Sequence, residues 1–176
     1  MMKYLHLLFV LTIFSSELLA CSFASWEPFE PTLERWKQNP GPAQLDKASG
    51  GEYWESAPAP VVLVSEIVRA TYKSGEPCSD AGLILLDVTL PDDSSYRIEE
   101  FGVYLRIQSG STPDLIFPDI PVIGRIEGRK MTLLFPWLDS HPSRQYPLDL
   151  VLEATLVTNG LNIGKPTVFH IKQDNS

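Results

Sequence analysis

The amino-acid sequence predicts an all-β protein, a two-sheet antiparallel sandwich of about seven strands within residues 60–173. Three observations favour this fold class. Apolar and polar residues alternate with period two in several short segments, as they do in half-buried strands. Turn-forming residues separate the segments, and no convincing helix lies between them. A small barrel is the alternative arrangement of the same strands.

Seven segments are expected to form the strands. The alternation is clearest in Leu83–Leu90, Phe101–Ile107, Lys130–Trp137 and Leu148–Val157, and the set is completed by Val61–Val68, Val122–Ile126 and Thr167–Ile171. The alternation also predicts that Leu105 and Phe135 are buried on facing sheets and that Trp137 belongs to the core.

The residues between these segments are typical of turns. Pro91–Ser95, Glu127–Arg129 and Asn159–Asn162 combine proline, glycine, asparagine, aspartate and serine. These residue types favour hairpins and loops. The 15 prolines of the chain also favour many turns and strand ends over long helices.

Two segments resemble parts of fibronectin type III and related immunoglobulin-like modules. Phe101–Leu105 (FGVYL) is similar to their third strand, and Leu148–Ile171, with the turn sequence NGLNIG, looks like their last hairpin. The resemblance covers about residues 60–172. The second strand, LILLDVTL, lacks the tryptophan that this pattern usually carries. The resemblance implies an immunoglobulin-like sandwich with no catalytic residues to transfer.

The N-terminal residues 1–20 have the features of a secretory signal peptide. Lys3 is followed by an apolar stretch, Leu5–Phe14, that is too short to span a bilayer, and small residues follow at Ala20 and Cys21. We therefore expect an exported protein. A buried N-terminal helix of the mature fold is the structural alternative.

The sequence Leu18-Leu19-Ala20-Cys21 resembles the lipobox of bacterial lipoproteins. The resemblance implies that Cys21 becomes the lipidated N-terminus and anchors the protein to a membrane. Ser22, rather than aspartate, follows this cysteine, which in that family implies the outer membrane, with the domain facing the periplasm or the surface. Cleavage after Ala24 is the alternative.

The two cysteines leave a second possibility open. Cys21 and Cys78 are the only cysteines of the chain, and an exported pair is usually a disulfide. A lipidated Cys21 could not also bond to Cys78. A Cys21–Cys78 disulfide would instead fit a soluble periplasmic protein with an accessory or chaperone-like role.

Residues 21–59 are expected to form a proline- and tryptophan-containing linker or tail. It is either a flexible stalk or a segment whose tryptophans pack on the domain or on a partner, such as another envelope protein. Trp26 and Trp36 are the candidate binding residues.

The composition argues against several functions. The formal net charge of −8 makes nucleic acid an improbable partner, because an acidic surface repels phosphates. The two histidines beyond the signal, His141 and His170, lie in no nucleophile-elbow or zinc-ligand pattern. We therefore expect no enzyme, no catalytic residues, no metal and no cofactor, and a binding or structural role.

Overall fold

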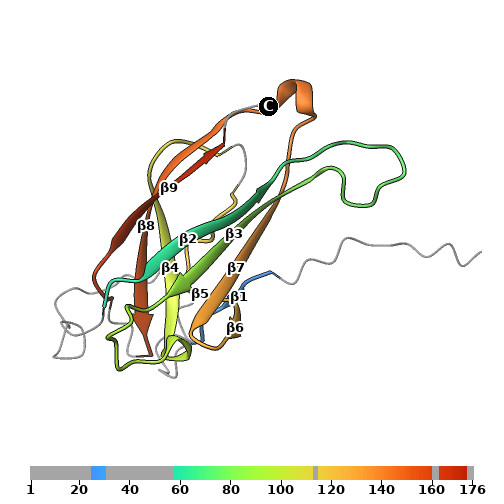
Figure 1. Ribbon diagram of the computed structural model, residues 1–176. Coiled ribbons are helices and arrows are strands. Elements are labelled where there is room, and N and C mark those ends of the chain that lie inside the picture. Colours follow the sequence, from blue (N-terminus) through green and yellow to red (C-terminus); the bar gives the residue numbers. More distant parts are fainter. Residues whose placement is uncertain (1–24, 31–57, 113–114, 160–162, 174–176) are drawn as a thin grey trace, which may run out of the picture.

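The computed structural model describes residues 25–30, 58–112, 115–159 and 163–173. These residues form two antiparallel sheets (Figure 1). Sheet A has the strand order β1-β5-β4-β8-β9, and sheet B has the order β2-β3-β7-β6. The strands of sheet A are β1 (Glu27–Pro28), β5 (Val122–Ile123), β4 (Phe101–Ser109), β8 (Leu148–Thr158) and β9 (Thr167–Gln173). Those of sheet B are β2 (Val61–Val68), β3 (Ala81–Thr89), β7 (Lys130–Leu138) and β6 (Arg125–Glu127).

The predicted fold class is confirmed, since the two sheets form a sandwich and do not close into a barrel. The pairing order β2-β3-β7-β6 in one sheet and β4-β8-β9 in the other corresponds to the ABED and CFG order of immunoglobulin-like sandwiches. The described helical turns are two short 3₁₀ segments, η2 (Ile98–Glu100) and η3 (Pro142–Arg144).

The core lies between the inner faces of the sheets. Leu105 of β4 and Phe135 of β7 are both buried there and belong to opposite sheets, as the alternation predicts. Trp137 is buried in the same core. Phe117, from the segment between β4 and β5, packs edge-on against Phe135 with ring centroids 5.0 Å apart. The regular alternation along β3 and β7 therefore reflects one apolar face on each strand. The strand β8 alternates in its first half and is buried on both faces from Ala154 to Thr158.

The segment Val122–Ile126 was expected to be one strand but is two. Val122–Ile123 pairs with β4 in sheet A, and the chain then crosses to sheet B, where β6 pairs with β7. Gly124 makes the crossing possible, because a Cβ atom there would lie 2.1 Å from the backbone oxygen of Thr132. Period-two alternation continues through such a crossing and does not report which sheet each residue joins.

Part of the expected linker belongs to the sandwich. Glu27 and Pro28 pair with Ile123 and Val122, which makes β1 the edge of sheet A. The next residue, Phe29, is buried against Gly102, where a Cβ atom would come within 2.5 Å of its ring. Residues 25–30 are thus held to the sandwich by pairing and by packing.

Candidate functional site

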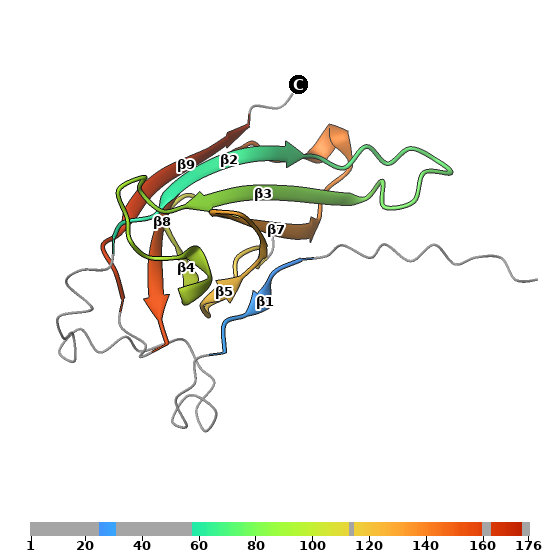
Figure 2. The same ribbon diagram turned by 60° about the horizontal axis from the view of Figure 1, so that its bottom comes forward.

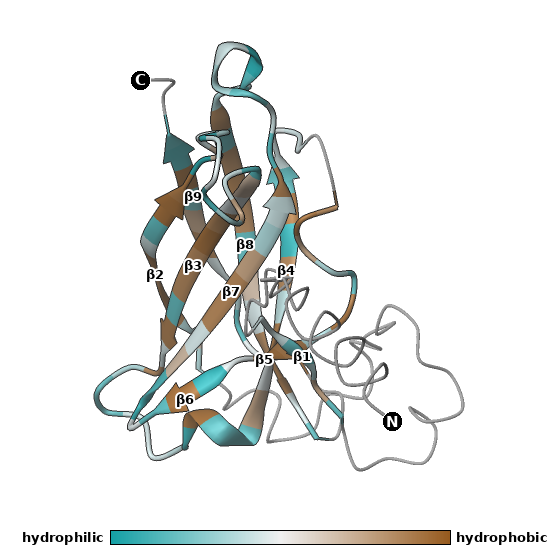
Figure 3. Ribbon diagram, turned by 90° about the vertical axis from the view of Figure 1, so that its right-hand side faces the viewer, coloured by the Kyte–Doolittle hydropathy of each residue, from teal (hydrophilic) through white to brown (hydrophobic). Residues whose placement is uncertain are grey.

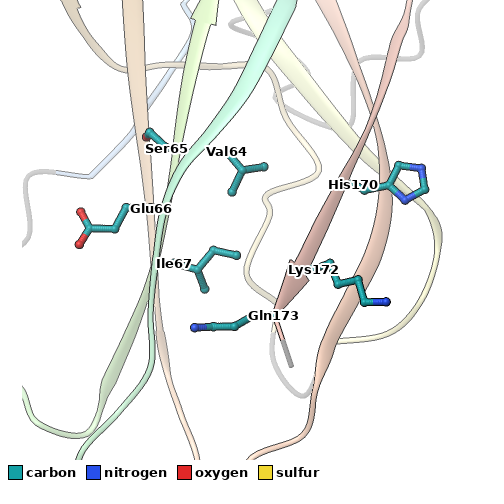
Figure 4. Close-up of a pocket in the computed structure, with 7 residues that line it drawn as sticks. All are labelled: Val64, Ser65, Glu66, Ile67, His170, Lys172 and Gln173. Carbon is teal, nitrogen blue, oxygen red and sulfur yellow. The ribbon is translucent and has the colours of Figure 1, made fainter. Parts of the chain in front are cut away.

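The candidate site is a groove on one side of the sandwich, between one edge strand of each sheet. In the described structure no further strand pairs with the outer side of either edge strand. These edges are β2 of sheet B and β9 of sheet A, which lie side by side in Figure 2. The groove has a volume of about 430 Å³. Its lining residues are Val64, Ser65, Glu66, Ile67, His170, Lys172 and Gln173 (Figure 4).

The apolar wall of the groove comes from β2. Val64 and Ile67 extend from β2 toward β9 (Figure 4), and both are half-buried against the core. Residues three apart share a face here because a β-bulge interrupts the pairing of β2 with β3 between Val64 and Glu66. Strict alternation would have placed Glu66 on the inner face. The bulge turns Glu66 outward and puts Ile67 in the groove.

The opposite wall is polar and comes from β9. The Gln173 side chain extends toward Ile67, while His170 and Lys172 point away from β2 (Figure 4). The Gln173 Oε1 atom is buried and has no hydrogen-bond partner in the described structure. A buried acceptor of this kind costs free energy until a donor reaches it. This wall therefore offers an unpaired acceptor to the groove, and His170 and Lys172 lie on its outer side.

Exposed apolar side chains continue beyond the groove along both edges. Leu63 is 62% exposed on β2, and Val168 is 57% exposed on β9. Colouring by hydropathy shows that much of β2, β3 and β7 is apolar (Figure 3). An exposed edge strand presents backbone groups that another chain can bind. These edges therefore offer both backbone groups and the exposed side chains of Leu63 and Val168 to another polypeptide.

Both ends of β2 are fixed to the rest of the sandwich. At its start, the Thr167 hydroxyl of β9 donates a hydrogen bond to the Pro60 carbonyl at 2.5 Å. At its end, Arg69 and Ala70 are bound by Asp139, which follows β7. The strand β2, which forms one wall of the groove, is thus held in place at both ends, which lowers the ordering cost of binding.

Arg69 and Asp139 form a clasp in which the charges are paired by two hydrogen bonds. Arg69 Nε donates to Oδ2 of Asp139 at 2.7 Å, and Nη2 donates to Oδ1 at 3.0 Å. The side chain of Asp139 is only 2% exposed and that of Arg69 13%. The backbone N–H groups of Ala70 and Ser140 complete the set of donors. A carboxylate with this many donors and a paired cation can be buried in its charged form.

The clasp also lowers the pKa of the Asp139 carboxyl. Burial alone would raise this pKa, but the hydrogen bonds from Arg69 and Ala70, the charge of Arg69 and the Ser140 N–H lower it more. The net pKa lies below the ordinary value of 3.8. Asp139 is therefore a structural anion, and it does not have the raised pKa of a general acid.

The loop that follows β2 is anchored to the same corner and contains Cys78. The Tyr72 hydroxyl donates to the Asp139 carbonyl at 2.7 Å, and the Thr71 and Tyr72 N–H groups donate to the Ser79 carbonyl. Cys78 is disulfide-bonded and has a φ of 62°. The other cysteine, Cys21, lies outside the described residues, so its pairing or lipidation remains a prediction.

The tryptophans expected to bind a partner are placed only in part. Trp26 is half-buried and packs against the hydrophobic core next to β1, so part of its ring serves the fold. Trp36 lies outside the described residues. Trp26 does not belong to the lining of the β2–β9 groove.

The described histidines occupy structural or rim positions. The Nδ1 atom of His141 accepts a hydrogen bond from the Ser143 N–H at 3.3 Å and so caps η3, and its ring contacts Tyr72. His170 lies at the groove. No carboxylate hydrogen-bonds to either ring in the part of the chain that the structure describes. Over the same residues, no three histidine, cysteine or acidic side chains gather as a metal site would require.

Comparisons with protein-family models, curated proteins and solved structures find no match to this chain. Within the described residues, no helix has the length and apolar character needed to cross a bilayer. The function of the chain is therefore inferred from the geometry of the groove and from the sequence.

Proposed function

We propose that this chain is an exported cell-envelope protein whose sandwich is a non-catalytic binding module for an extended polypeptide segment. The observation that carries the proposal is the β2–β9 groove, which has an apolar wall and lies between two edge strands. A peptide entering this groove could pair its backbone with an edge strand and place alternate side chains on Val64 and Ile67. This mode of recognition is β-strand addition.

Peptide binding tests the proposal. A capped nine-residue peptide that alternates valine with serine should bind the wild-type protein in a fluorescence-polarisation titration. Val64→Glu should weaken binding by about tenfold or more, because the bound peptide would desolvate the new carboxylate. Leu138→Glu is the control, since Leu138 is 73% exposed and lies outside the groove. Equal affinities for Val64→Glu and the wild type would refute a binding site in the groove.

The state of Cys78 supports export to an oxidising compartment. Disulfides persist in such compartments and are rare in the cytosol. With two cysteines in the chain, an intramolecular bond would join Cys78 to Cys21. It would close a loop of more than fifty residues. In the chain-entropy model, closing such a loop stabilises the folded state by about 4 kcal/mol. We therefore favour the disulfide-linked periplasmic protein over the lipid-anchored one.

A lipid anchor is the second candidate, and the lipobox-like sequence Leu18–Cys21 supports it. Intact-mass spectrometry of the mature protein without reductant distinguishes the two. The disulfide form should gain the mass of two hydrogen atoms on reduction and should remain in the aqueous phase during detergent partition. A mass increased by acyl chains, with partition into detergent that Cys21→Ser abolishes, would contradict the disulfide and establish the anchor.

A further inference from the structure

We propose that the segment bound in the groove is an acidic strand that pairs with β9 and carries apolar side chains at alternate positions. This inference rests on the proposed function and specifies which edge is used and which charge the partner carries.

The pairing of the neighbouring strands identifies β9 as the better template. The register of β8 with β9 runs from Leu148↔Gln173 to Ala154↔Thr167 without a shift. The pairing of β2 with β3 is interrupted by the bulge in β2. There the Ser65 hydroxyl donates a hydrogen bond to the Leu85 carbonyl at 3.2 Å. An added strand needs evenly spaced backbone groups over several residues, and a bulge disrupts that spacing. An added strand would therefore extend sheet A at β9.

The position of β2 explains why the added strand would carry apolar side chains at alternate positions. A strand added to β9 would run beside β2, with every second side chain facing into the sandwich. Val64 and Ile67 extend into this space and are half-buried already. Apolar side chains on the added strand would complete their burial. An N–H group of the peptide could also satisfy the free Oε1 of Gln173.

The side chains of β9 explain why the added strand would also carry acidic residues. His170 and Lys172 alternate with the buried Phe169 and Ile171, so they lie on the outer face of the sheet. Residues 163–173 include Lys165 as well and contain no acidic residue, whereas the whole chain has a net charge of −8. On β8, Val151 lies opposite His170 and Asp149 opposite Lys172, and no ion pair joins Asp149 to Lys172 in the described structure. Acidic residues on an added strand would lie directly beside this basic edge.

The same charges disfavour a second copy of this chain at β9. Two β9 strands paired side by side would bring two Lys172 side chains to one edge, and residues 163–173 contain no acidic residue to pair with them. Like charges across a strand pair are destabilising. A partner of opposite charge avoids this arrangement.

The inference is tested with three capped nine-residue peptides. In these peptides valine alternates with glutamate, with serine or with lysine. The wild-type protein should bind the glutamate peptide about fivefold more tightly than the serine peptide, and the lysine peptide more weakly still. The variant His170→Glu/Lys172→Glu should reverse the order. The variant Lys73→Glu/Arg125→Glu changes exposed basic residues away from the groove and should keep the wild-type order.

The possible outcomes separate the two proposals. Equal binding of the three peptides, or an order that the His170/Lys172 variant leaves unchanged, would refute the acidic partner while the binding module stands. Failure of all three peptides to bind would refute the binding module itself. A dimer seen by sedimentation that Val64→Glu dissociates would assign the groove to a second copy and overturn the inference.

Discussion

Replacing Arg69 with alanine is expected to lower the free energy of unfolding by about 3 kcal/mol, because the Asp139 carboxylate would remain buried without its cation. Two hydrogen bonds join these side chains, and Asp139 is almost completely covered. Urea unfolding followed by tryptophan fluorescence measures the change. The exposed ion pair of Arg125 with Glu127 provides the control, and Arg125→Ala should change stability by less than about 0.5 kcal/mol. Equal effects of the two substitutions would contradict the assignment of the clasp.

The pH dependence of stability gives a second measure of the clasp. Since the pKa of Asp139 is lowered by folding, its contribution to stability is present above its ordinary value of 3.8. The contribution is lost as the pH falls below that value and through the lower pKa of the folded state. The stability difference between the wild type and Asp139→Asn should therefore shrink as the pH falls through this range. A constant difference would show that Asp139 does not have a lowered pKa.

Phe135→Ala should lower the free energy of unfolding by about 3–5 kcal/mol, through lost burial and the cavity left in the core. Phe135 is fully buried in β7 and contacts Phe117 edge-on. Thermal unfolding should show a decrease in Tm on the order of 10 °C. Leu138→Ala on the same strand is the matched control and should have little effect, since Leu138 is mostly exposed. A decrease of only a degree or two for Phe135→Ala would mean that the two sheets do not pack as described.

The sequence could predict most of the strands because each has one apolar face. The expected strand Val61–Val68 has the same bounds as β2, and the expected ends of the strands that became β3, β4, β7, β8 and β9 differ by one or two residues. The sequence could not predict β1, because a two-residue strand has no periodicity. It also could not predict the crossing at Gly124, because alternation does not identify the partner strand.

The site was less predictable for a physical reason. Arg69 and Asp139 are 70 positions apart and lie in loops, so no spacing rule connects them. The apolar run of Val61–Val68 predicted a strand but not its place at an edge. The consecutive polar residues Ser65 and Glu66 interrupt its alternation and were a usable signal for the bulge that brings Ile67 into the groove. The basic character of residues 163–173 in an acidic chain was a second usable signal.

Amide hydrogen exchange measured with and without the valine–glutamate peptide tests the central claim most directly. An added strand would bond to the outer backbone groups of β9, so the peptide should slow exchange at amides within residues 168–173. The edge strand β6, on the opposite side of sheet B, should be unaffected. The slowing should disappear in Val64→Glu. Binding of the peptide with no slowing in β9, or with slowing confined to other strands, would contradict strand addition at the β2–β9 groove.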